Sequence, residues 1–267
     1  MKRAALLVVA AAVAIVDLAP LALILKQALT PERESFAWPP TWLPHAVTLE
    51  NFRTVTGAVE FGRGVVLSLG VAGATVAAAL ALALPAAWLA ARRPTYDRPL
   101  DVVMVVTRVF PSIALAVPLA SLFVGLGLYD HPAGVGLWLA HTLVGLPFAF
   151  LVLRAAFRGV PPEFEEAAQL DGATPAAMFV RVTLPLVRPS LAAAALLVFL
   201  VSWDEFAYAL LLQVTHRSLP PLLYYFAAFG FPGLASALAA IMLVPALLVV
   251  LVLEPALRSG VLAGSSR

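Results

Sequence analysis

Residues 163–189, EFEEAAQLDGATPAAMFVRVTLPLVRP, form the most polar interval in the C-terminal half of the chain, and long apolar segments lie on both sides of it. The chain of 267 residues is 62% hydrophobic and only 12% charged, whereas a soluble domain carries about a quarter charged residues. Too little polar surface is available to cover such a chain in water, so its natural solvent is lipid. We therefore interpret 163–189 as a structured loop that a membrane protein holds out into water.

Apolar stretches on both sides of this loop are long enough to be membrane spans, since about 20 helical residues cross a ~30 Å hydrocarbon core. They cover residues 4–25, 65–91, 100–126, 137–153, 190–212 and 234–253. We predict an all-α membrane protein, a single transmembrane domain over 1–267 with six transmembrane helices. A cleaved signal peptide is an alternative for the first stretch, because Lys2 and Arg3 precede it.

Basic residues distinguish the two sides of the predicted membrane protein. One side holds eleven of them: Lys2, Arg3, Arg92, Arg93, Arg98, Arg154, Arg158, Arg181, Arg188, Arg258 and Arg267. The other side holds five: Lys26, Arg33, Arg53, Arg63 and Arg217. Because cytoplasmic loops carry the excess of basic residues, both termini and the loop 154–189 are predicted to be cytoplasmic.

The loop begins with signals of a short helix. Pro161 and Pro162 are tolerated in a first helical turn. Three carboxylates follow there and meet the positive end of the helix dipole, namely Glu163, Glu165 and Glu166. Ala167 and Ala168 are good helix formers that leave a smooth face.

A turn and a second helix are predicted next. Asp171 and Gly172 break the first helix, since glycine is the usual residue for a left-handed C-terminal cap. Thr174 is placed to cap a second helix that starts at Pro175. From the residues alone, the pair of helices fits either a docking surface for another protein or an amphipathic anchor at the membrane interface.

The register of this loop resembles the EAA loop of permease subunits of bacterial ABC importers. Glu166-Ala167-Ala168 is followed by Gly172 after three residues and by Leu184-Pro185. Segment 36–52, FAWPPTWLPHAVTLENF, resembles the first periplasmic loop of the maltose-type, carbohydrate-uptake branch. Residues 203–206, WDEF, resemble that branch's Trp-Asn-Glu-Phe element, with Asp204 in place of Asn. The similarity covers nearly the whole chain and implies the type I ABC importer permease fold.

The resemblance also implies a mechanism and partners. The EAA loop of the family is a coupling helix that sits in a cleft of a cytoplasmic ATPase, so Glu166 is expected to be the docking carboxylate and Gly172 the bend. The residues expected to couple to the ATPase are Glu165, Glu166, Ala167, Ala168, Asp171, Gly172, Leu184 and Pro185. The expected partners are a second homologous permease, two ATPase subunits that bind ATP and Mg, and an extracytoplasmic solute-binding protein. The expected location is the lipid bilayer of the bacterial cytoplasmic membrane.

The sequence does not indicate a nucleotide-phosphate site, a metal site or a nucleic-acid-binding site. The two lysines lie outside any Gly-x-x-x-x-Gly-Lys-Ser/Thr motif, so the chain is predicted to be no enzyme, to bind no cofactor and to depend on a partner for ATP hydrolysis. The four scattered histidines, interpreted as interfacial or solvated, have no metal-site spacing: His45, His131, His141 and His216. A formal net charge of +2 does not suggest nucleic-acid binding.

Polar residues inside predicted spans are functional candidates, because placing them in hydrocarbon is costly. Arg108, Asp204, Glu205 and Tyr208 fit a hydrated path for a polar solute. They equally fit a structural ion pair at a subunit interface, in which Arg108 would face Asp17, Asp204 or Glu205.

The expected cargo is a mono-, di- or oligosaccharide. Polyols, glycerol phosphate or a sulfonated sugar are alternative cargoes for the same kind of ABC importer. A proton-coupled secondary transporter, an intramembrane hydrolase and a purely structural subunit are alternatives of other classes.

Overall fold

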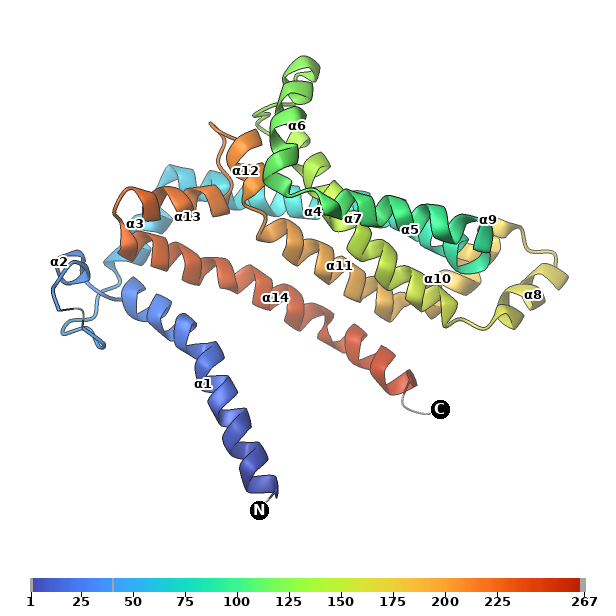
Figure 1. Ribbon diagram of the computed structural model, residues 1–267, viewed down its shortest axis with the longest axis horizontal. Helices are drawn as coiled ribbons and strands as arrows, with labels where there is room; N and C mark the ends of the chain where they lie inside the picture. The colour runs from blue at the N-terminus through green and yellow to red at the C-terminus, as the bar shows by residue number, and fades with distance from the viewer. Residues whose placement is uncertain (1, 40, 265–267) are drawn as a thin grey trace. The chain divides into compact units, whose positions relative to one another are not determined.

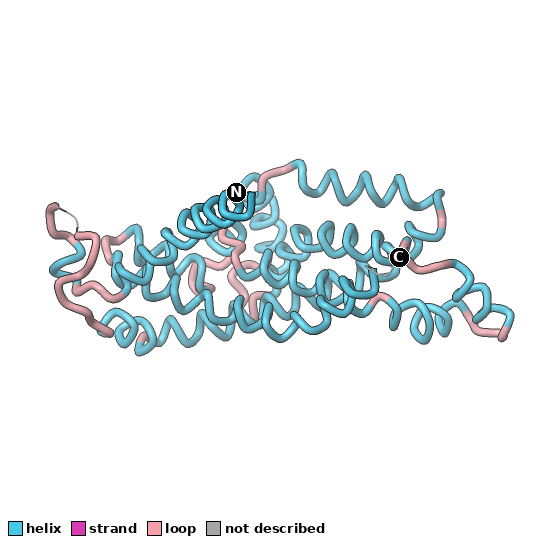
Figure 2. Tube along the Cα trace, turned by 90° about the horizontal axis from the view of Figure 1, so that it is seen from below, coloured by secondary structure: helices cyan, strands magenta, loops and turns pink. Residues whose placement is uncertain are grey.

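The computed structural model describes residues 2–39 and 41–264, and every regular element in that part of the chain is helical (Figures 1 and 2). Four helices are long and apolar enough to cross a membrane: α1 (Lys2–Ala28), α4 (Val59–Arg92), α7 (Val135–Arg158) and α14 (Pro232–Gly264). Two further spans are possible if each of two bent helix pairs crosses as a unit. The predicted all-α membrane fold is confirmed, with four to six candidate spans.

The predicted third span, 100–126, is not one straight helix. It is divided into α5 (Pro94–Val109) and α6 (Ser112–Leu126), which meet at an angle of 95°. Phe110 between them is extended, with φ −88° and ψ 132°. Pro111 explains the break, because proline lacks an N–H and drives the preceding residue out of the helical region.

The predicted fifth span, 190–212, is also interrupted. Helix α11 (Arg188–Trp203) ends at Trp203, and the short α12 (Ala207–Leu212) follows. The Glu205 carboxylate accepts hydrogen bonds from the backbone N–H groups of Tyr208, at 2.9 Å, and Ala209, at 3.4 Å. An acidic side chain that caps a new helix in this way competes with continuation of the old one.

The chain separates into two compact units. The first contains the described residues of Met1–Val65 and Leu219–Pro245, including α2 (Glu32–Ser35), α3 (Glu50–Gly57) and α13 (Leu219–Ala228). Helix α13 lies in the interval 213–233 between two predicted spans, and its prolines lie in its first turn, where they are tolerated. Buried Asn51 donates to the carbonyls of Ala28, at 2.9 Å, and Thr30, at 3.0 Å, and so fastens α3 to the end of α1.

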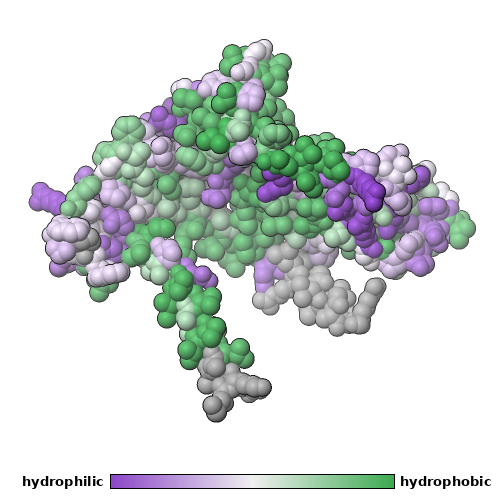
Figure 3. Space-filling model, in the orientation of Figure 1, coloured by the Kyte–Doolittle hydropathy of each residue, from purple (hydrophilic) through white to green (hydrophobic). Residues whose placement is uncertain are grey.

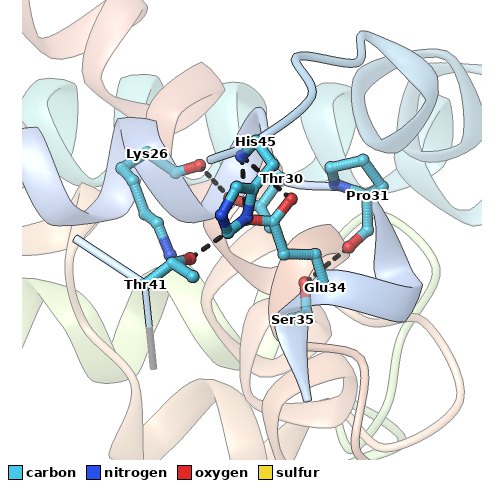
Figure 4. A network of polar contacts seen from close by, with 7 residues as sticks. All are labelled: Lys26, Thr30, Pro31, Glu34, Ser35, Thr41 and His45. Atoms are coloured by element: carbon cyan, nitrogen blue, oxygen red, sulfur yellow. Dashed lines mark hydrogen bonds and ion pairs between the residues drawn. The ribbon is translucent and has the colours of Figure 1, made fainter. Parts of the chain in front are cut away.

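The connection between α1 and α3 is ordered around Glu34 (Figure 4). One carboxylate oxygen of Glu34 accepts from the Thr41 hydroxyl at 3.0 Å and from the His45 backbone N–H at 2.9 Å. The His45 backbone bond is the main reason that the pKa of Glu34 is lowered. Hydrogen bonds from Ser35 to the Pro31 carbonyl and from Thr30 to the Lys26 carbonyl fix the start of this segment.

The second unit contains the described residues of Val66–Ser218 and Ala246–Arg267. Here α7 packs along α11 and against α5, and α12 packs against α6 (Figure 1). Alanines of α4 at 79, 83, 87 and 90 are buried against aromatic and aliphatic side chains of α7, which include Phe150, Leu153 and Phe157. Small residues on this face of α4 leave room for the larger side chains of the same cluster.

The surface of this second unit changes character along its length (Figure 3). Hydrophilic residues gather at the end that carries α8 (Pro162–Leu170) and α9 (Pro175–Met178), whereas apolar residues cover much of the adjoining surface. The polar interval seen in the sequence thus lies at a polar end of its unit.

Candidate functional site

The segment after α7 folds as two short helices around a glycine turn, as predicted. Helix α8 starts at Pro162, and Gly172 adopts a left-handed conformation with φ +81° just after its end. The Ala173 N–H donates to the Ala168 carbonyl at 2.9 Å, which closes the turn. The Thr174 hydroxyl caps α9 by accepting from the Ala177 N–H at 3.3 Å.

The second helix continues past α9 toward the bundle. A π-helical turn, η1 (Phe179–Thr183), and α10 (Leu184–Leu186) extend it, and α11 follows at an angle of 80°. Leu184 and Pro185 are half-buried, and Leu184 packs against the core of the second unit. These two candidate residues therefore join the segment to the bundle instead of standing on its outer surface.

Other candidate coupling residues share an exposed face. Glu166, Ala167, Asp171 and Gly172 are exposed, and Ala168 is half-buried. Leu170 is 89% exposed beside them. A carboxylate, a small side chain and an exposed leucine together suit docking against another protein, because the small residue permits close approach and the leucine supplies apolar area.

Glu165 is separated from this face although it adjoins Glu166 in sequence. Its side chain is buried and accepts from Arg92 Nε at 2.9 Å, Trp88 Nε1 at 3.1 Å and Thr183 Oγ1 at 2.9 Å. Burial alone would raise the pKa of Glu165, but the hydrogen bonds from Arg92, Trp88 and Thr183 together lower it below its ordinary value. The spacing of residues in the sequence did not show that Glu165 is buried while Glu166 is exposed.

Arg108 makes a cation–π contact in the second unit. Its guanidinium lies 4.0 Å from the centre of the Phe148 ring, a cation–π geometry, and its side chain is exposed. Within the described residues of the second unit, no ion pair joins Arg108 to Asp204 or Glu205. Asp17 is exposed on α1.

The remaining intramembrane candidates are divided between surface and core. Asp204 is exposed, whereas Tyr208 is 1% exposed and the Glu205 side chain 9% exposed. Glu205 lies 3.5 Å from Nε2 of His141, and Nδ1 of His141 lies 2.8 Å from the Ser202 hydroxyl. The Glu205 carboxylate, which accepts from the Tyr208 backbone N–H, therefore belongs to the α11–α12 break.

His141 is the polar residue that sequence reasoning misjudged. It is only 3% exposed, so its interpretation as interfacial or solvated is wrong. The signal available in the sequence was its place within the predicted apolar span 137–153, where a histidine needs a polar partner. Ser202 supplies a hydrogen-bond partner for Nδ1, whereas Nε2 makes no hydrogen bond among the described residues and lies 3.5 Å from the Glu205 carboxylate.

The described residues contain no group of three or more histidine, cysteine or carboxylate side chains placed to hold a metal ion. A cavity of about 260 Å³ lies within the first unit. Its lining residues are Glu32, Ser35, Thr48, Glu50, Asn51, Thr54, Phe231, Pro232, Gly233 and Leu234.

Asp130 closes the connection between α6 and α7 against residues 215–216. Its carboxylate accepts from the backbone N–H groups of Thr215, at 3.0 Å, and His216, at 3.2 Å. Burial raises the pKa of Asp130, but hydrogen bonds from Thr215 and His216 outweigh burial and leave it lowered. A carboxyl with a lowered folded pKa stabilises the fold above its unfolded pKa, and this stabilisation is lost as the pH falls through the folded value.

We therefore expect the 213–217 segment to loosen only at a pH below the ordinary pKa range of an aspartate carboxyl, where Asp130 becomes protonated in the folded state. Amide exchange at Thr215 and His216, corrected for the intrinsic rate, should accelerate roughly tenfold on acidification, since a hydrogen bond to a charged group contributes about 1.5–3 kcal/mol. In the Asp130→Asn variant the exchange should already be fast at neutral pH. Equal protection of both proteins at pH 6 would contradict this role.

Comparisons with known proteins agree with this architecture. Residues 64–261 match the family described as binding-protein-dependent transport system inner membrane component. The chain is 31% identical over 262 residues to the sulfoquinovosyl glycerol transport system permease protein SmoH of Agrobacterium fabrum, covering 96% of this chain and 91% of the relative. It is 35% identical over 179 residues to the trehalose transport system permease protein SugB of Mycobacterium tuberculosis, covering 66% of this chain and 64% of the relative.

A solved structure shares the fold of the whole chain. It is the crystal structure of a bacterial ABC transporter involved in the import of the acidic polysaccharide alginate, with a TM-score of 0.75, 20% identity, and 95% of each chain covered. The family match, over residues 64–261, covers most of the chain. This chain therefore belongs to the family of inner membrane components of binding-protein-dependent transport systems.

Proposed function

We propose that this chain is a permease subunit of an ATP-driven importer for a sugar, and that the exposed face of α8 docks on the ATPase. The observation that carries the proposal is the combination of an exposed Glu166 and a left-handed Gly172 on a segment at the polar end of the second unit. The chain has no phosphate-binding Gly-x-x-x-x-Gly-Lys-Ser/Thr motif of its own. Two partner ATPases that bind ATP and Mg would therefore supply the energy.

The remaining partners follow from the family description and from what is said of the relatives. A binding-protein-dependent system implies a solute-binding protein outside the membrane, and a second permease would complete the path. Trehalose, sulfoquinovosyl glycerol and alginate are carbohydrates or carbohydrate derivatives, which supports a sugar as cargo here. Membership of a binding-protein-dependent transport family favours an ATP-driven importer over a proton-coupled secondary transporter.

Reconstituted transport tests the proposal. In proteoliposomes that hold the complete complex, uptake of radiolabelled sugar is expected to require ATP on the side of α8 and the loaded binding protein on the other. A protonophore should have no effect. The panel should contain trehalose, an alginate oligosaccharide and the polyol sorbitol. Uptake that persists without ATP but stops with the protonophore would support the secondary-transporter alternative, and uptake of sorbitol alone would exclude a sugar.

The proposed cytoplasmic position of both termini and of 154–189 can be tested directly. The chain has no cysteine, so Leu170→Cys introduces a single reactive group on a residue that is 89% exposed. A membrane-impermeant maleimide should label it in inside-out vesicles and fail to label it in intact cells, with at least a tenfold difference. Trp42→Cys, on the 83% exposed Trp42 of the opposite predicted side, should show the reverse pattern.

A further inference from the structure

Glu165 and Arg92 form a buried ion pair between the start of the coupling segment and the end of α4. Arg92 Nε lies 2.9 Å from one carboxylate oxygen of Glu165, and Arg92 Nη2 lies 3.1 Å from the other. The two side chains are 17% and 8% exposed. An arginine that grips both oxygens holds a carboxylate in a defined orientation as well as at a defined distance.

Further contacts extend this pair into a three-point attachment. Arg92 Nη2 also donates to the Val160 carbonyl at 3.1 Å, just before α8 begins. Thr183, at the end of η1, donates to Glu165 at 2.9 Å. The entry to α8, its first turn and the end of η1 are therefore all connected to one carboxylate–guanidinium pair.

An aromatic contact supports the same junction. Trp88 donates to Glu165 at 3.1 Å, and its ring lies 5.2 Å from that of Phe179 in η1. Phe179 also contacts Phe157 at the end of α7, with a ring distance of 5.9 Å. Helix α8 itself packs mainly on α9 and η1, so side chains at 88, 92 and 165 provide its direct attachment to α4.

We propose that Glu165 and Arg92 are positioning residues that transmit movement of the α8–α9 segment to α4. This inference rests on the proposed coupling function but assigns Glu165 a role distinct from docking. A force applied to the exposed face of α8 would rotate the segment freely unless a rigid connection carried it into the bundle. The buried pair supplies that connection, because displacing either partner would leave an uncompensated charge in a poorly solvated site.

Distance measurements test the attachment without depending on transport. Leu82→Cys on α4 and Phe164→Cys on α8, outside the docking face, place spin labels on two exposed residues of an otherwise cysteine-free chain. In the assembled complex, the distance distribution between the labels should be narrow, and Glu165→Gln should broaden it at least twofold. Arg92→Lys should give an intermediate width, since lysine cannot reproduce the bidentate contact and the bond to Val160 together.

Transport measurements test the consequence. With Glu165→Gln, the ATPases should still co-purify and hydrolyse ATP, whereas the amount of sugar imported per ATP should fall at least tenfold. Glu163→Gln, which removes a charge from an exposed side chain in the same turn, is the matched control and should change neither measurement. Thr183→Val, which removes a single hydrogen bond, provides a milder variant if Glu165→Gln does not fold.

The outcomes separate this inference from the proposed function. A narrow distance distribution and an unchanged import-to-ATP ratio in Glu165→Gln, or in Thr183→Val if it is used instead, would overturn the positioning role. Loss of ATPase co-purification in Glu165→Gln with a narrow distribution would also overturn it, because Glu165 would then be acting in docking. If the unmodified complex fails to import sugar, the proposed function fails, while the distance measurement still decides whether the pair holds α8 on α4.

Discussion

Glu166→Lys is expected to abolish ATP-driven uptake while the chain remains folded and inserted. Glu166 is exposed, and no hydrogen bond or ion pair to another described residue holds it, so charge reversal disturbs no contact within the chain. At the proposed interface, however, a carboxylate that meets a basic group would be replaced by a like charge, which costs several kcal/mol. A loss of that size lowers an association constant at least a hundredfold. Co-purification of the ATPase and sugar uptake measure the effect.

Two further variants make this expectation specific. Glu60→Lys, the same charge change on an exposed residue at the start of α4, should leave both measurements unchanged. Gly172→Val should impair coupling by a different route, because a left-handed conformation costs a non-glycine residue about 1–2 kcal/mol. Uptake that survives both Glu166→Lys and Gly172→Val would show that α8 does not couple this chain to an ATPase.

Gly136→Ala is expected to destabilise the second unit substantially. A Cβ at this position would lie 2.5 Å from the backbone oxygen of Leu128 and 2.9 Å from a ring carbon of Phe123. Backbone cannot move aside as a flexible side chain can, so the junction of α6 and α7 must open. Overpacking of this kind costs about 1–3 kcal/mol, which corresponds to a fall of roughly 2–12 °C in the thermal unfolding midpoint measured in detergent.

Gly125→Ala is the matched control for that experiment. Gly125 lies in α6, and an added Cβ would meet nothing within 4 Å. Since alanine favours helix more than glycine does, this variant should be neutral or slightly more stable. A midpoint for Gly136→Ala equal to that of Gly125→Ala would mean that the α6–α7 junction is not closely packed.

The sequence by itself determined the fold class and the local form of the polar segment. Long apolar runs require lipid, and helices satisfy their backbone groups there without distant partners. The helix, glycine turn and capped second helix at 162–178 were predictable for a related reason. Proline, glycine and a capping threonine act within one or two turns of their own position, as the left-handed Gly172 and the Thr174 cap illustrate.

Only the tertiary structure decided which side chains face inward and how the spans are broken. Glu165 and Glu166 have the same chemistry, and the partner that turns Glu165 inward, Arg92, lies 73 residues away. His141 is likewise buried because Ser202, 61 residues distant, meets it. Pro111 and Glu205 were visible in the sequence and mark where two predicted spans are interrupted, but the angle of 95° between α5 and α6 was not predicted from them. Local signals act over a few residues, whereas the orientation and burial of side chains are set by contacts between segments far apart in the chain.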